Sequence, residues 1–166
     1  MSNKKKKEFM SLYNPVHSRF ERFCKARVYG EMDFRDLMQE TVVVAFEKFD
    51  EIRNTDTFLN FLFGISIRIL SNSNRKIKEE RLTPSIEVTY NQNSTVDKKL
   101  EIDDLYQALA KLPDNQKEAL ILFEISGFSI REIAILQENT EDAVKKRLSR
   151  GRQELAKLLM DTPIVA

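Results

Sequence analysis

The sequence has few of the residues that build disulfides, metal sites and catalytic triads. Its 166 residues include one cysteine, Cys24, and one histidine, His17. A single cysteine excludes an intramolecular disulfide framework and is usual in a protein of the reducing cytoplasm. One histidine and one cysteine also leave too few side chains for a zinc site or a nucleophilic triad. We therefore expect no metal site, no cofactor and no enzymatic activity.

Glycine, proline and long apolar runs are scarce as well. The chain has 4 Gly and 4 Pro, which favours helices over tightly turning structures. The most apolar segment, Phe58 to Leu70, is too short to span a bilayer and contains Asn60, Gly64 and Arg68. No apolar core follows the lysines at the N-terminus, so this start is not a secretory signal. These absences predict a helical cytoplasmic protein without membrane insertion.

Charge is nearly balanced over the whole chain but is segregated along it. The formal net charge is +1. Residues 31–58 contain eight acidic and three basic residues, a local charge of −5, whereas residues 64–81 and 140–160 each carry a local charge of +3. Such segregation favours one acidic surface for a protein partner and two basic surfaces for phosphate, and a solvated mixed surface is the alternative.

Apolar residues recur at helical spacing in two groups, on either side of a polar stretch. The first group predicts three helices, over about residues 15–29, 33–49 and 57–78, after a lysine-rich start (residues 1–8) that we expect to be disordered. Residues 82–99 have no sustained apolar period, so we interpret them as a flexible linker that limited proteolysis should cut first. The second group predicts four more helices. The expected fold class is all-α, with two small helical domains joined by a flexible linker.

One stretch in the second group, GFSIREIAILQENTEDAVKKRLSRG (residues 127–151), predicts two short helices and a tight turn. Ser129 can cap the first helix and, with Glu132, complete a capping box, while Thr140 can cap the second helix. Val144 and Leu148 recur on the buried side of the second helix. Its outward side carries a basic cluster of Lys145, Lys146, Arg147, Arg150 and Arg152. This layout is typical of a helix-turn-helix whose second helix enters the major groove, and an ordinary helical hairpin with a solvated basic face is the alternative.

Four sequence blocks, in order, resemble bacterial RNA polymerase sigma factors. FRDLMQETVVVAFEKF (34–49) resembles conserved region two, and FLNFLFGISIRILSNSNRK (58–76) resembles the promoter-melting segment that follows it. LPDNQKEALILFEISGFSIREIA and AVKKRLSRGRQEL resemble region four. The two-domain layout is similar to that of the small extracytoplasmic-function class. The resemblance implies region two over residues 9–81, a linker over 82–99 and region four over 100–161. It also implies a protein that is not an enzyme and that gives RNA polymerase its promoter specificity.

The resemblance also implies three sets of functional residues. Region-two residues that bind core RNA polymerase would be Asp36, Leu37, Gln39 and Glu40. Residues that bind the minus-ten element would be Asn54, Phe61, Arg68, Asn72, Arg75 and Lys76. Residues that bind the minus-thirty-five element would be Ser129, Thr140, Lys145, Lys146, Arg147 and Arg150.

The residues themselves refine these sets. Asp36 and Glu40 are four apart, so they lie on one helical face and suit arginines on a partner. Phe58, Phe61 and Phe63 lie at helical spacing among aliphatic residues, which favours a place in the core over stacking on unpaired bases. The usual glycine of the region-four turn is replaced by Glu138, so the turn is expected to differ in detail.

The partners implied are core RNA polymerase, promoter DNA and an anti-sigma factor. Two alternatives are an autonomous helix-turn-helix regulator and a helical adaptor without DNA affinity. We expect at least one of Lys145, Lys146 and Arg147 to read bases. Arg150 is a turn further from the helix start, and we expect it to contact phosphate.

Overall fold

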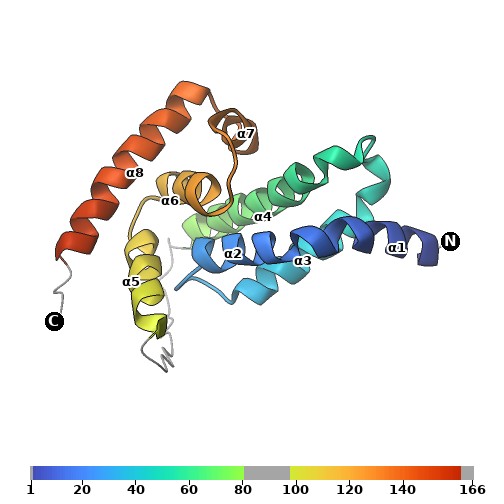
Figure 1. Ribbon diagram of the computed structural model, residues 1–166, viewed down its shortest axis with the longest axis horizontal. Coiled ribbons are helices and arrows are strands. Elements are labelled where there is room, and N and C mark those ends of the chain that lie inside the picture. The colour runs from blue at the N-terminus through green and yellow to red at the C-terminus, as the bar shows by residue number, and fades with distance from the viewer. Residues whose placement is uncertain (1, 81–97, 162–166) are drawn as a thin grey trace.

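The computed structural model describes residues 2–80 and 98–161, and these residues form helices joined by short turns (Figure 1). No strand occurs among them, so the all-α fold class is confirmed. None of the described helices is long and apolar enough to cross a membrane. Most of the expected linker, residues 82–97, lies outside the described residues. The elements are α1 (Ser2–Tyr13), η1 (Asn14–Val16), α2 (His17–Arg27), α3 (Phe34–Glu47), η2 (Phe49–Glu51), η3 (Thr55–Thr57), α4 (Phe58–Glu80), α5 (Lys98–Ala110), α6 (Asp114–Leu120), η4 (Ile121–Ile125), α7 (Ile130–Leu136) and α8 (Glu141–Asp161).

The N-terminal helix α1 corrects one expectation. Residues 1–8 were expected to be disordered, but α1 begins at Ser2 and runs to Tyr13. The reason is Phe9, whose side chain is buried against the rings of Phe46, Phe49 and Phe58, each with its centroid 5.5 Å away. Tyr13, which stacks on Phe9, is buried as well, so aromatic residues dock the helix while most of its lysines stay in solvent.

The first domain is built from α1 to α4 around a core of aromatic rings. Phe20, Phe23 and Phe63 are fully buried and pack on one another at centroid distances of 4.9 to 6.5 Å. Phe58 is buried as well and Phe61 is half-buried, as the helical spacing predicted. Burial raises the pKa of the Cys24 thiol beyond its usual range. Burial, helped by nearby Cys24 and Glu21, also raises the pKa of Tyr13 to about 12.

The second domain places the long helix α8 across α6 and α7. The π-helical segment η4 continues α6 and supplies Ile121 and Leu122 to the core. Val144 and Leu148, which the spacing assigned to the buried side of α8, are both buried. Gly151 brings α8 close to α6, because a Cβ atom there would lie 2.9 Å from Leu120 Cδ1. Figure 1 shows α6 lying between α8 and the first domain.

The two domains pack against each other along a contact that we call the joint. On the first domain it includes Arg19, Arg27, Tyr29, Glu31 and Phe63, and on the second Tyr106, Lys117, Glu118, Ser126 and Phe128. Phe128 is buried, with its ring 4.9 Å from that of Phe63 and the Arg19 guanidinium 4.9 Å from its centroid. Two ion pairs cross the joint. Arg27 Nε donates to Glu118 Oε2 at 3.1 Å, and Lys117 Nζ donates to Glu31 Oε1 at 2.8 Å.

Candidate nucleic-acid and protein interfaces

The helix-turn-helix forms where the sequence predicted it, beginning with the cap of α7. Ser129 Oγ accepts a hydrogen bond from the Glu132 backbone N–H at 3.1 Å, and Glu132 Oε1 accepts one from the Ser129 N–H at 3.0 Å. The predicted capping box is therefore confirmed. Gly127, at φ +79°, turns the chain from η4 toward this cap, as only glycine does without strain. Ser129, expected among the DNA-binding residues, commits its side chain to the cap.

The turn between α7 and α8 is made by Glu138 and Asn139. Glu138 adopts φ +53°, the left-handed conformation that glycine occupies most easily. Glutamate thus occupies a position where glycine is favoured. Asn139 Oδ1 then accepts from the Thr140 N–H at 2.8 Å, and Thr140 Oγ1 accepts from the Ala143 N–H at 3.1 Å. The second hydrogen bond confirms Thr140 as the cap of α8.

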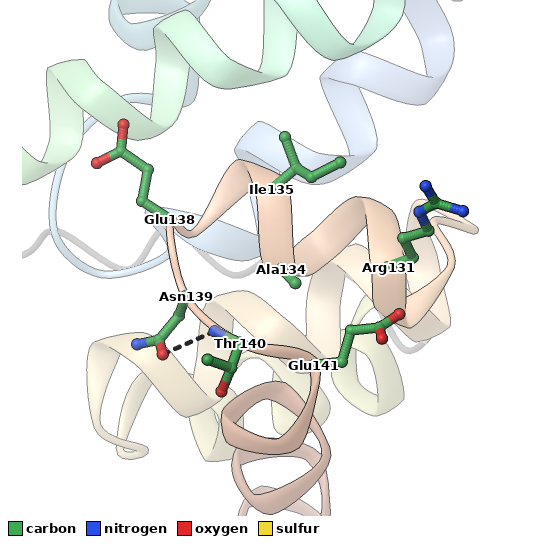
Figure 2. Close-up of a pocket in the computed structure, with 7 residues that line it drawn as sticks. All are labelled: Arg131, Ala134, Ile135, Glu138, Asn139, Thr140 and Glu141. Carbon is green, nitrogen blue, oxygen red and sulfur yellow. Dashed lines mark hydrogen bonds between the residues drawn. The ribbon is translucent and has the colours of Figure 1, made fainter.

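An open concavity of about 730 Å³ lies over this turn (Figure 2). Figure 2 shows Arg131 and Ile135 projecting from α7, and Thr140 and Glu141 at the start of α8. Ile135 is 70% exposed, the opposite of its buried neighbours Ala134 and Leu136. Ala134, Glu138 and Asn139 complete the lining. The concavity thus joins the outward side of the first helix of the motif to the start of the second.

The basic cluster on α8 divides into two kinds of side chain. Lys145, Lys146 and Arg150 are exposed, and no carboxylate in the described part of the chain forms an ion pair with them. Arg147 is half-buried, and its Nη1 donates to Gln137 Oε1 at 2.9 Å. Arg152, further along, is paired with Glu124 at 2.9 Å. The structure therefore presents Lys145, Lys146 and Arg150 to solvent and holds Arg147 against the turn.

The acidic surface of the first domain lies on α3. Asp33 caps this helix by accepting from the Arg35 N–H at 2.9 Å. Hydrogen bonds from the Arg35 side chain and backbone hold the pKa of the Asp33 carboxyl below its usual range. The expected polymerase-binding residues Asp36, Gln39 and Glu40 are all exposed on the helix that follows.

Leu37 does not belong to that surface. Its side chain is 0% exposed and packs in the core of the first domain, so it is not available on the acidic surface. Two residues that the sequence interpretation missed extend the surface instead. Val43, which is 57% exposed, and Glu47 follow Asp36, Gln39 and Glu40 at helical spacing. This spacing was the available signal, but an exposed valine is hard to distinguish from a core residue by its type.

The expected minus-ten residues are spread over η3 and α4. Asn54 is exposed and its Oδ1 accepts from the Asp56 N–H at 3.0 Å, which caps η3. Arg68 and Asn72 are exposed and four residues apart, so they share a face of α4, whereas Phe61 is half-buried beside Phe58. Arg75 and Lys76 lie further along α4, beyond the side chains that the structure describes. Among the described residues, no group of three or more His, Cys, Asp or Glu side chains is placed to hold a metal ion.

Comparison with known proteins identifies the family. Residues 102–155 match the family model of sigma-70, region 4, a span that covers the helix-turn-helix. The ECF RNA polymerase sigma factor EcfG of Rhodopseudomonas palustris is 32% identical over 126 residues, which cover 75% of this chain and 70% of that protein. The chain belongs to the ECF class of RNA polymerase sigma factors. It is therefore a transcription initiation factor that directs RNA polymerase to promoters.

Other relatives of this sigma factor extend the match over nearly the whole chain. The RNA polymerase sigma factor SigV of Bacillus subtilis is 27% identical over 80% of this chain and 79% of its own length. The solved structure of the sigma factor RpoE in complex with the anti-sigma factor NepR from Bartonella quintana superimposes with a TM-score of 0.76 at 26% identity. That match covers 94% of this chain and 99% of the solved one. The structure of CnrH in complex with the cytosolic domain of CnrY shares the fold, with a TM-score of 0.69 at 23% identity.

Proposed function

We propose that this sigma factor divides its contacts among three surfaces. The exposed acidic face of α3 binds core RNA polymerase, α8 reads the minus-thirty-five element, and η3 with α4 binds the minus-ten element. In this assignment region two spans residues 9–81, and the start of α1 precedes it. Region four spans residues 100–161. The protein has no catalytic step of its own and works in the cytoplasm, beside the polymerase.

The observation that carries the proposal is the basic face at the start of α8. The helix begins at a turn that leaves its first residues in solvent, and Lys145, Lys146 and Arg150 project from it without an ion-pair partner in the described part of the chain. Lysine and arginine on such a helix bind guanine edges and phosphates in the major groove. Glu141 and Asp142 also stand at the start of α8, where they favour the helix dipole and repel phosphate. The lysines and Arg150 are thus the residues that attract DNA.

The acidic face of α3 suits a positively charged protein partner. Asp36 and Glu40 lie one turn apart and have no ion-pair partner within the described residues, so both carboxylates can accept from arginines. Val43, between Glu40 and Glu47 on the same helix, adds an exposed apolar side chain that a solvated surface does not need. A charged rim around an apolar residue is the usual anatomy of a protein interface.

An anti-sigma factor is the second protein partner that we propose. The support is the match over 99% of the Bartonella quintana sigma factor, whose solved structure holds the anti-sigma factor NepR. Such a partner would control when the sigma factor reaches the polymerase.

Run-off transcription with core RNA polymerase on a genomic library tests the proposed function. Addition of this chain should yield transcripts that start downstream of a shared pair of sequence elements. Binding to a palindromic site without polymerase would instead indicate an autonomous regulator. A chain with no effect on transcription and no DNA affinity, even with polymerase present, would be a helical adaptor.

Charge reversal on α3 tests the polymerase surface. The double variant Asp36→Lys/Glu40→Lys should weaken binding to core polymerase by about tenfold or more, because it replaces attraction by like-charge repulsion at the interface. Both side chains are exposed, so circular dichroism and thermal unfolding should change little. The matched control, Glu8→Lys/Glu51→Lys, makes the same charge change at exposed residues elsewhere on the domain. Equal affinities of the test and control variants for core polymerase would remove this assignment.

Alanine variants on α8 separate base reading from phosphate contact. Loss of a base-reading side chain at Lys145 or Lys146 should cost about 1–3 kcal/mol and relax the preference at one upstream position. Loss of Arg150 should weaken all promoters about equally and flatten the salt dependence. Lys157→Ala, an exposed lysine further along α8, is the control. If the alanine variants of Lys145, Lys146 and Arg150 all keep the native promoter preference and salt slope, α8 does not read DNA.

A further inference from the structure

A continuous series of hydrogen bonds runs from the first domain to α8. Arg27 Nε on α2 donates to Glu118 Oε2 on α6 at 3.1 Å. The other oxygen of that carboxylate, Oε1, accepts from Gln137 Nε2 at 3.2 Å. Gln137 Oε1, at the end of α7, accepts from Arg147 Nη1 on α8 at 2.9 Å. Side chains from α2, α6, the C-cap of α7 and α8 thus connect the joint to the basic cluster of α8.

The chemistry of these groups makes Gln137 the necessary middle member. A carboxylate accepts only and a guanidinium donates only, so Glu118 and Arg147 can share a neighbour only if it both donates and accepts. A side-chain amide does both, and only one orientation of the Gln137 amide turns its NH₂ to Glu118 and its oxygen to Arg147. The Asn115 backbone oxygen, which also accepts from Gln137 Nε2 at 3.2 Å, favours the same orientation.

At the joint, the hydrogen-bond series begins with a buried pair, Arg27 and Glu118, and some polar atoms there have no hydrogen-bond partner. Arg27 is 2% exposed and Glu118 is 7% exposed, so their ion pair is desolvated. Arg27 Nη1 has no hydrogen-bond partner and lies 3.8 Å from Glu31 Oε2, and Ser126 Oγ at the same joint also has none. A desolvated pair with unsatisfied polar groups contributes little net stability, because both charges are well hydrated once they separate. The joint is therefore suited to opening without unfolding either domain.

We propose that Gln137 is a positioning residue that couples the joint between the domains to Arg147 of α8. In the packed molecule Glu118 orients Gln137, and Gln137 holds Arg147 against the turn and away from the exposed lysines. Separation of the domains removes Arg27 from Glu118, loosens the Gln137 amide and releases Arg147 toward DNA. Coupling between two sites is reciprocal, so DNA that captures Arg147 also weakens the joint. The role of Arg147 at DNA rests on the proposed function, but its link to the joint does not.

Thiol labelling in the full chain measures opening of the joint. Ser126→Cys places a thiol at the joint, where the Ser126 hydroxyl makes no hydrogen bond that would be lost. A thiol at a buried position reacts at a rate proportional to the population in which it is exposed, so rare opening is detectable. The native Cys24, fully buried in the core of the first domain, reports global unfolding in the same sample.

The variants form a double-mutant cycle in this background. Arg147→Ala should speed labelling of the introduced thiol roughly tenfold, the scale of one hydrogen bond to a charged group, and leave Cys24 labelling unchanged. Gln137→Leu should have a similar effect, and adding Arg147→Ala to it should change the rate no further, because Arg147 reaches the joint only through Gln137. Lys157→Ala, which removes an exposed lysine further along α8, is the control and should label like the parent. An unchanged labelling rate in Arg147→Ala would overturn the proposed coupling. So would an equal acceleration by Arg147→Ala in the parent and in the Gln137→Leu background.

A DNA arm separates failure of the relay from failure of the proposed function. Saturation with a randomised duplex pool, with binding followed by fluorescence anisotropy, should speed labelling in the parent and not in Arg147→Ala. Binding without acceleration in the parent would overturn the reciprocal link to DNA. Absence of duplex binding would count against the proposed binding of DNA by α8. The double-mutant cycle measured without DNA would still decide whether Gln137 couples Arg147 to the joint.

Discussion

Individual residues at the helix-turn-helix show how far local chemistry determines the motif. Ser129 and Thr140 act as caps, as the sequence predicted, because a hydroxyl side chain followed by helix formers satisfies backbone N–H groups by purely local contacts. The place of Arg147 was not predictable, because its partner Gln137 lies ten residues away and is in turn oriented by α6. Residue type indicated a basic helix, and only the packing of α6, α7 and α8 separates Arg147 from Lys145 and Lys146.

Glu138 carries a residue-scale prediction. A non-glycine residue at φ +53° is strained by about 1–2 kcal/mol, and glycine loses about 0.5–1 kcal/mol in chain entropy on folding. Glu138→Gly should therefore stabilise the second domain by up to about 1 kcal/mol in urea unfolding. Glu138→Ile should destabilise it, because a β-branched residue is poorly tolerated at positive φ. Equal destabilisation by glycine and isoleucine would show that the glutamate side chain, rather than the backbone, stabilises the turn.

At the scale of elements, periodicity located the helices better than composition did. The apolar spacing in α3 and α8 predicted buried faces that contain Ala45, Val144 and Leu148, all of which are buried. The lysine-rich composition before Phe9 suggested disorder, because like charges oppose an isolated helix. The helix α1 forms because Phe9 docks on aromatic rings from α3, η2 and α4, a contact between segments about forty residues apart.

Phe9 provides the element-scale prediction. Phe9→Ala should cost about 3–5 kcal/mol of the free energy of unfolding, as for other buried phenylalanines, and should release α1. Hydrogen exchange should then show lost protection for amides of α1 and retained protection in α3 and α4. Lys6→Ala, an exposed residue of the same helix, is the control and should change stability by less than about 0.5 kcal/mol. Retained protection of α1 in Phe9→Ala would show that other contacts dock the helix.

At the scale of the whole molecule, the sequence predicted two helical domains but not their packing. The joint pairs residues that are far apart in the sequence, such as Lys117 with Glu31, 86 positions apart, and Ser126 with Arg19, 107 positions apart. Neither helical period nor motif resemblance contains this information, because each charged residue of the joint is compatible with a solvent-facing position on its own domain. Arg27, Lys117 and Glu118 are buried, which is unusual for charged residues, and the packing of the two domains against each other explains this burial.

Phe128 is the aromatic residue that closes the joint, and its loss should separate the domains. Its ring contacts Phe63 and Arg19 of the first domain, and its backbone N–H donates to the Leu122 oxygen, a bond that an alanine keeps. We therefore expect Phe128→Ala to raise the radius of gyration in small-angle X-ray scattering. Calorimetry should also resolve the single unfolding transition expected of the native chain into two, because each domain then unfolds without support from the other. Phe123→Ala is the control, since the half-buried Phe123 ring contacts Arg152 of its own domain and should lower stability without extending the molecule. An unchanged radius of gyration together with a single transition in Phe128→Ala would show that the remaining contacts, which include the two ion pairs and the Tyr29–Tyr106 ring contact, suffice to hold the joint.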